Sequence, residues 1–141
     1  MVYWCELVGR ALPDVSVLAG PERAYFAVSC LVGEVYNGGF DQFFSNSSGE
    51  LYEDALEGLD RMQAMESASL LRRAKAILFG STPVPTAREE RTALMPTFGA
   101  DQSAPEWSQL EALDKAFWND PDKLGDRCVA YAKEHHLNEP G

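Results

Sequence analysis

Five acidic side chains recur at helical spacing in the middle of the chain, and we call them the acidic stripe: Glu50, Glu53, Asp54, Glu57 and Asp60. On a helix with 100° between residues they fall within an arc of about 120°, and apolar residues fill the opposite side. Ionised carboxylates accept charge-assisted hydrogen bonds from Arg and Lys side chains. The stripe is therefore a candidate surface for a basic partner, although acids on one face are also typical of a solvated helix.

The charge of the stripe is dense enough to compare with that of DNA. The stripe spans about ten residues, or about 15 Å of helix at 1.5 Å per residue. Duplex DNA carries one negative charge per roughly 1.7 Å of its axis, so the stripe has about half that charge density. Residues 34–66 hold eight acids against Arg61 alone, and residues 101–126 hold seven acids against two lysines. We expect acids of the second segment to assist the stripe as surrogates for phosphate groups.

A second group of candidate residues lies in a short run that we call the Asn37–Asn46 corner. Its glycine, aromatic and amide positions are Asn37, Gly38, Gly39, Phe40, Gln42, Phe43, Phe44 and Asn46. The three phenylalanines stand at i, i+3 and i+4, which places their rings on one face and predicts burial. The glycines permit a tight reversal of the chain, and the amides suit the binding of loop backbone groups. We interpret the corner as structural, with a ligand pocket around the amides as the alternative.

Residue types that support catalysis or metal binding do not occur at suitable spacing. His135 and His136 are the only histidines, and neighbours on a helix point about 100° apart, so they cannot form an i, i+4 metal pair. The three cysteines are scattered and carry no local signature of a nucleophile. Asp41 is a candidate acid or base without an evident partner. We therefore expect a protein that is not an enzyme, with no catalytic residue, no metal and no cofactor.

Composition limits the class of protein. The 141 residues carry 22 acidic and 12 basic side chains, which gives a formal charge of −10 and a pI near 4.5. Such a chain is repelled by phosphate, which argues against direct binding to nucleic acid or to an anionic membrane. No apolar run is long enough to span a bilayer, and the first residues lack the basic region of a secretory signal. Together with the odd number of cysteines, these features predict a cytoplasmic location.

The apolar spacing is helical along nearly the whole chain and predicts an all-α protein. The expected helices cover about 21–37, 40–44, 47–63, 67–79, 86–94, 105–117 and 121–136. Gly38 and Gly39 are expected to stop the first of them, and Ser47 and Glu50 have the spacing of a capping box for the third. No repeat or linker divides the chain, so residues 1–141 are expected to form a single compact domain of six to eight helices.

The stretch EVYNGGFDQFFSNSSG, residues 34–49, resembles the signature of a family of small acidic bacterial DNA-mimic-like proteins, which is mostly classed as a domain of unknown function. Further similarities are Ala55-Leu56 in the acidic segment and the late pattern Leu113-Asp114-x-x-Phe117 followed by Tyr131-Ala132. The resemblance covers residues 22–135. It implies an all-helical fold without established catalysis, and the name of the family adds a DNA-mimic role.

These observations lead to one functional hypothesis with two alternatives. The protein is expected to be an acidic decoy that occupies the basic surface of a nucleic-acid-binding protein, with the acidic stripe as its contact surface. An immunity-type inhibitor of a basic toxin would have the same sequence features. The alternative from another class is a small-ligand protein or enzyme built around the Asn37–Asn46 corner. The sequence leaves both a monomer and a homodimer open.

Overall fold

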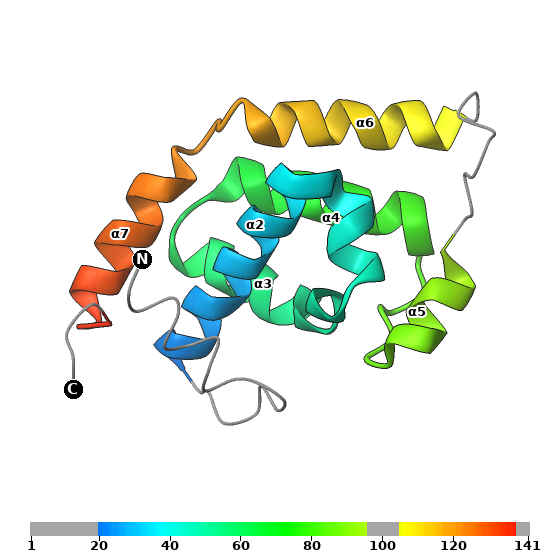
Figure 1. Ribbon diagram of the computed structural model, residues 1–141. Coiled ribbons are helices and arrows are strands. Elements are labelled where there is room, and N and C mark those ends of the chain that lie inside the picture. Colours follow the sequence, from blue (N-terminus) through cyan, green and yellow to red (C-terminus); the bar gives the residue numbers. More distant parts are fainter. Residues whose placement is uncertain (1–19, 96–104, 138–141) are drawn as a thin grey trace.

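The computed structural model describes residues 20–95 and 105–137, and these residues form helices with no strand among them (Figure 1). The elements are α2 (Pro21–Ser45), the 3-10 helix η2 (Ser47–Leu51), α3 (Tyr52–Arg61), α4 (Met65–Phe79), α5 (Arg88–Leu94), α6 (Pro105–Trp118) and α7 (Leu124–Glu134). The prediction of a single all-α domain with six to eight helices is confirmed. None of the described helices combines the length and the apolar composition needed to cross a membrane.

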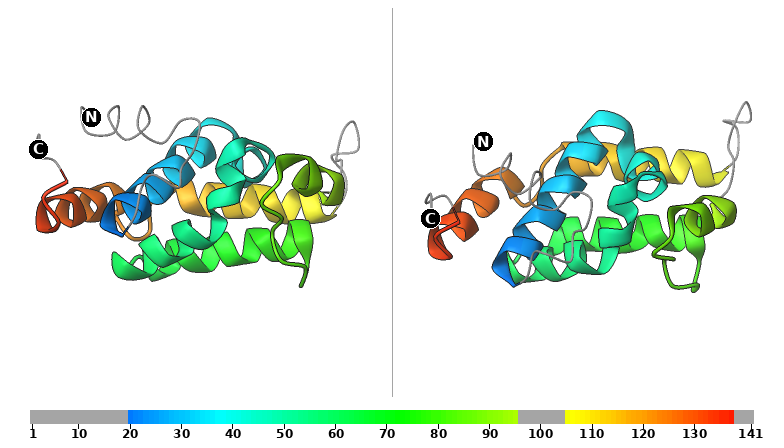
Figure 2. Two further views of the ribbon diagram at one scale, coloured as in Figure 1. Left: turned by 90° about the horizontal axis from the view of Figure 1, so that it is seen from below. Right: turned by 60° about the horizontal axis from the view of Figure 1, so that its bottom comes forward.

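Helix α2 is the central element of the arrangement. It contacts α3, η2, α5, α6 and α7, while α4 contacts α3 and α6. In Figure 1, α6 runs along the top of the molecule, α7 lies at the left and α5 at the lower right. Figure 2 shows the same helices from below and from an intermediate angle. The helices α3 and α6 therefore occupy different sides of α2 and α4.

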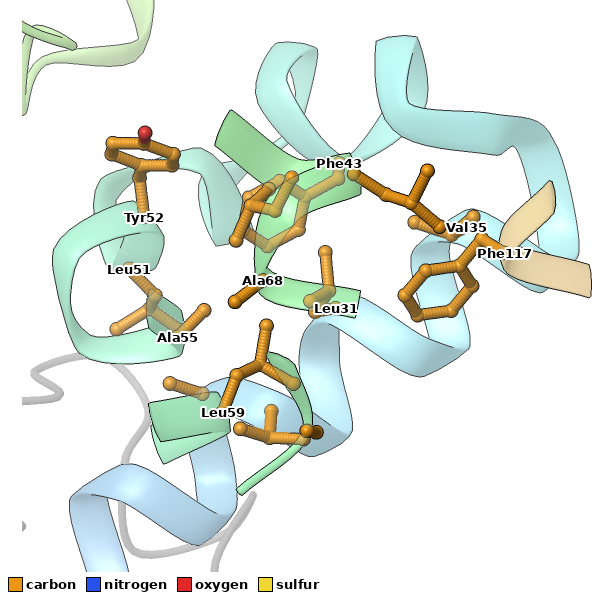
Figure 3. Close-up of a cluster of buried hydrophobic side chains, with 14 of the residues drawn as sticks. Leu31, Val35, Phe43, Leu51, Tyr52, Ala55, Leu59, Ala68 and Phe117 are labelled. Atoms are coloured by element: carbon orange, nitrogen blue, oxygen red, sulfur yellow. The ribbon is translucent and has the colours of Figure 1, made fainter. Parts of the chain in front are cut away.

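The aromatic side chains of the Asn37–Asn46 corner enter the core, as their spacing predicts. Phe40, Phe43 and Phe44 are completely buried. The Phe44 ring lies 5.4 Å from the Phe79 ring and the Phe40 ring 5.5 Å from the Phe117 ring, measured between ring centroids. Figure 3 shows Phe43 among the leucine, alanine and valine side chains of the same core. These rings connect the end of α2 with α4 and α6.

The break in α2 falls at one glycine only. Gly39 has φ 86° and ψ 179°, whereas the helix continues on both sides of it, so α2 is kinked and ends at Ser45. This break agrees with the expectation that the first helix stops at Gly38 and Gly39 and that a short helix over about 40–44 follows, although the two helices are joined in one kinked element. The helix resumes because the Phe40 backbone N–H finds a partner outside it, the carboxylate of Asp114, at 2.8 Å.

The capping box predicted for Ser47 and Glu50 does not form. Residues Ser47–Leu51 are a 3-10 helix, and neither η2 nor α3 has a side-chain cap at its start. The neighbouring Ser48 hydroxyl donates instead to the Phe43 carbonyl, at 2.9 Å, toward the preceding helix. Because the chain turns tightly after Ser45, the Ser48 side chain binds the end of α2 rather than the beginning of α3.

Two other helix boundaries differ from the expectation. Helix α3 ends at Arg61, because Gln63 adopts a positive φ of 59°. Helix α7 begins at Leu124, since Asp120 and Lys123 also have positive φ values.

Truncation of a buried ring tests the core. We expect Phe43→Ala or Phe44→Ala to lower the free energy of unfolding by about 3–5 kcal/mol, because each removes a fully buried aromatic side chain. Denaturant unfolding followed by circular dichroism measures the change. Val129→Ala is the matched control, since Val129 is exposed and its truncation should leave the free energy of unfolding nearly unchanged. Equal stability of the two core variants and the parent would contradict the packing described here.

Candidate binding surface

The acidic stripe lies on the outer face of η2 and α3. Helix α3 buries Tyr52, Ala55, Gly58 and Leu59 against the rest of the protein. Four members of the stripe are exposed: Glu50, Glu53, Glu57 and Asp60. The fifth, Asp54, is half-buried at the edge of the stripe. The helical spacing of the sequence thus separates the acids from the buried face, as the amphipathic pattern predicts.

Two members of the stripe already have partners within the protein. Asp54 forms an ion pair with Arg23 of α2, with 3.0 Å between carboxylate oxygen and Nε. Glu57 accepts from Arg61 one turn later, at 2.7 Å. Within residues 20–95 and 105–137, no ion pair links Glu50, Glu53 or Asp60 to a basic side chain. These three side chains are exposed, and the charge of Glu50 also acts on the nearby Arg91.

Helix α3 is held at close range by α2, which fixes the position of the stripe. Gly58 faces α2 so closely that an added Cβ would lie 2.6 Å from a Val28 methyl group and 2.9 Å from the Ala24 carbonyl oxygen. Only a glycine allows the two helices to approach to this distance. The stripe is therefore presented from a packed helix and not from a loop.

The second candidate region, the Asn37–Asn46 corner, contains a chain of polar contacts. One Glu34 carboxylate oxygen accepts from the Gln42 amide and from the Asn46 amide, each at 2.9 Å. The kink at Gly39 brings these residues back toward the preceding turns of α2. The amides that sequence analysis assigned to loop backbone groups therefore bind a carboxylate of the same helix, while Asn37 and Gly38 are exposed.

A carboxylate from α6 completes the corner. Asp114 accepts from the Phe40 N–H, and a Cβ on Gly39 would collide with the same carboxylate. Burial raises the pKa of Asp114 to about 6, the Phe40 N–H acts in the opposite direction, and the charges of Asp41 and Glu111 raise it further. Burial also raises the pKa of Asp41. The kink is thus held by an acid that titrates near neutral pH.

Arg91 is the residue of this region that sequence analysis did not single out. Arg91 is only 1% exposed, and its side chain makes hydrogen bonds to backbone carbonyls. Its guanidinium donates to Phe44 at 2.9 Å and to Asn46 at 2.7 Å, at the end of α2, and also to Pro85 and Thr86. Burial lowers the pKa of Arg91, and the nearby charge of Glu50 raises it. The signal that could have found Arg91 in the sequence is the helical spacing of α5, had it placed residue 91 on the buried side of the helix.

The groups considered for catalysis are dispersed. Cys30 is half-buried in α2 and Cys128 is buried in α7, and burial raises the pKa of their thiols to about 12 and about 11. His135 packs on the Tyr131 ring, with 4.4 Å between centroids. In the part of the chain that the structure describes, no three His, Cys, Asp or Glu side chains are grouped so as to hold a metal ion.

The comparison with known families decides the relationship that residues 34–49 indicated. A family model described as DMP19-like protein matches residues 16–135. The chain belongs to the DMP19-like protein family. The match confirms the resemblance to the DNA-mimic-like proteins and begins six residues before the segment expected from sequence. No curated protein and no solved structure matches the chain.

The stability of this DMP19-like protein should respond to pH through Asp114. The pKa of Asp114 is raised to about 6 in the folded protein. Between about pH 6 and pH 4, its carboxyl group is therefore protonated in the folded state and ionised in the unfolded chain. The contribution of this group to stability therefore increases as the pH falls through that range. Asp114→Asn keeps an oxygen that can accept from Phe40 and removes the charge, so the variant should melt higher than the parent at pH 7.5.

The advantage of Asp114→Asn should shrink as the pH is lowered to 4.5, which melting curves across pH measure directly. Glu106→Gln is the control, since Glu106 is an exposed acid at the start of the same helix. A difference in melting temperature between Asp114→Asn and the parent that is the same at every pH would contradict the titration of Asp114.

Proposed function

We propose that this DMP19-like protein is a non-enzymatic acidic binding protein that acts as a DNA mimic. The acidic stripe would bind the basic surface of a nucleic-acid-binding protein and occupy the positions that DNA phosphates otherwise take. An inhibitor of a basic toxin would use the same contacts and would differ only in its partner. A cytoplasmic location belongs to this proposal, because such partners act there.

The observation that carries the proposal is the exposure of four stripe carboxylates on one side of a packed helix. Ion pairs at an exposed surface are weak individually, so recognition of a basic surface requires several carboxylates held in fixed relation. Burial of Ala55 and Leu59, together with the close packing at Gly58, supplies that fixed relation. The stripe therefore combines charge, exposure and a rigid support.

The other acids near the core support the same assignment by contrast. Asp114 accepts from the Phe40 N–H, Asp122 from the Ser67 N–H, and Glu34 from two amides. These carboxylates satisfy polar groups of the protein itself. Glu53 and Asp60 have no such contact among the described residues, so their charge is available to a partner.

The contacts within the Asn37–Asn46 corner favour the binding role over a ligand site there. Gln42 and Asn46 use their amide groups on Glu34, and the Gln42 side chain fills the space beside Gly38. The three phenylalanines of the corner are buried. A ligand at this place would have to displace contacts that hold the kink of α2, which supports the structural interpretation.

Neutralisation of the stripe tests the proposal. We expect Glu53→Gln, Glu57→Gln and Asp60→Asn in one variant to weaken binding of the partner by about tenfold, if each lost ion pair contributes about 0.5 kcal/mol. The melting temperature should stay close to that of the parent, since relief of like-charge repulsion offsets the lost contact with Arg61. Capture of basic proteins from lysate at low and high salt, followed by titration of the captured partner, measures the effect.

A matched control separates the stripe from the overall charge. Glu89→Gln, Glu90→Gln and Glu134→Gln remove the same charge from exposed positions of α5 and α7. This variant should bind the partner almost as tightly as the parent. Equal loss of affinity in the two triple variants would show that net charge, and not the stripe, determines binding. Full affinity in the stripe variant would exclude the stripe as the contact surface.

The proposal also predicts what the purified protein does not bind. With a formal charge of −10, it should show no salt-sensitive binding to a labelled DNA duplex at micromolar concentration. Its melting temperature should be the same with and without EDTA. Tight duplex binding would require residues 67–91 to form a separate basic face, and a loss of stability in EDTA would reveal a metal site.

A further inference from the structure

We propose that Tyr36 of α2 and Trp118 of α6, with the Asp120 carboxylate beside them, form a second binding surface that takes arginine side chains of a basic protein. Among the described residues, these are the two large aromatic side chains that are strongly exposed, at 50% for Tyr36 and 45% for Trp118. We call this surface the aromatic seam. It lies where α6 contacts α2; α6 runs along the top of Figure 1, whereas α3 lies below it.

The two aromatic side chains are fixed by a reciprocal contact between neighbouring residues. The Trp118 indole N–H donates to the Val35 carbonyl at 2.9 Å, and the Tyr36 ring packs edge-on against Phe117 with 5.9 Å between centroids. Figure 3 shows Val35 and Phe117 close together at the right of the core. Residues 35–36 and 117–118 therefore lie side by side, and the exposed rings are held in place before any partner binds.

Fixed aromatic side chains at a surface are suited to binding. Tyr and Trp are enriched among the residues that contribute most to protein interfaces. Rings that are already ordered lose little conformational entropy on binding. Solvation of the Trp118 N–H gives no reason for its exposure, since this group already binds the Val35 carbonyl. The exposed faces of the two rings therefore offer contact area for a partner.

The charge around the seam selects a cation. Partial burial and then the negative charge of Asp120 raise the pKa of Tyr36, which places that carboxylate near the ring. The backbone N–H of Asp120 donates to the Phe117 carbonyl at 2.9 Å, which places Asp120 in the turn directly after Trp118. Helix α6 contributes one basic residue, Lys115. The Asp120 carboxylate beside the Tyr36 ring is the complement of a basic side chain.

Arginine fits this combination better than lysine. Its guanidinium group is planar, stacks on aromatic faces and can at the same time donate to a carboxylate. A lysine ammonium group is a compact, strongly hydrated charge that gains less from a ring. The seam thus differs in chemistry from the acidic stripe, where carboxylates act without aromatic side chains. Binding at the seam does not require that the stripe be functional.

Hexaarginine and hexalysine peptides, which carry equal charge, test the seam on the full chain by isothermal titration calorimetry. We expect hexaarginine to bind about two- to fivefold more tightly than hexalysine, which is the range of an exposed cation–π contact. Tyr36→Leu keeps an apolar side chain against Phe117 and removes one of the two exposed π systems, so it should reduce the preference for arginine. Tyr36→Phe should retain the preference, because it keeps the aromatic face.

Two controls make the result specific. Met65→Ser changes an apolar side chain of similar exposure (54%) on α4 and should leave the arginine preference intact. The stripe variant Glu53→Gln, Glu57→Gln, Asp60→Asn should bind both peptides more weakly without changing their ratio, which separates failure of the seam from failure of the proposed function. Equal affinity of the parent for the two peptides would overturn the proposal, as would an unchanged preference in Tyr36→Leu. A change in oligomeric state in Tyr36→Leu would assign the seam to a second copy of the chain and would likewise overturn it.

Discussion

An α-helix leaves its first N–H groups and its last C=O groups without partners inside the helix, and in this protein charged side chains from other segments supply many of them. Carboxylates bind at the beginnings: Asp114 accepts from Phe40, where α2 resumes after its kink, and Asp122 accepts from Ser67 in the first turn of α4 at 2.6 Å. The N-cap residues of α2, α3, α4, α5 and α7 make no side-chain cap of their own. The positions of α4 and of the second part of α2 therefore depend on contacts that cross the fold, and the signs of these charges agree with the helix dipole.

Cations bind at the ends of helices by the same logic, and this divides the charges of the protein into two groups. Arg91 donates to carbonyls at the end of α2, and Arg127 donates to the Met62 carbonyl at the end of α3 at 3.1 Å. The charged side chains that bind helix ends form the first group. They are used inside the fold and contribute little to an external surface. The exposed acids of α3 form the second group. They concentrate part of the net charge of −10 on one helix.

Local patterns in the sequence determined the helical fold and much of the surface. The spacing of Phe40, Phe43 and Phe44 predicted three buried rings, and the spacing of the acids predicted their separation from the buried side of α3. The residues 34–49 also indicated the family. The two predictions from residue spacing hold because the helical period of 3.6 residues is a property of the helical backbone itself. Every turn repeats this period, whatever the rest of the protein does.

The partners of the charged residues were decided only by the tertiary structure. Asp114 lies 74 residues from Phe40 and Asp122 lies 55 residues from Ser67, so no local pattern connects them. The burial of Arg91 among backbone carbonyls depended on how α5 packs at the end of α2, and the exposure of Tyr36 and Trp118 depended on how α6 crosses α2. The capping box at Ser47 failed for the same reason, since the end of α2 took the neighbouring hydroxyl. Sequence fixes which side of a helix is apolar, whereas helix packing decides which charged group reaches which helix end.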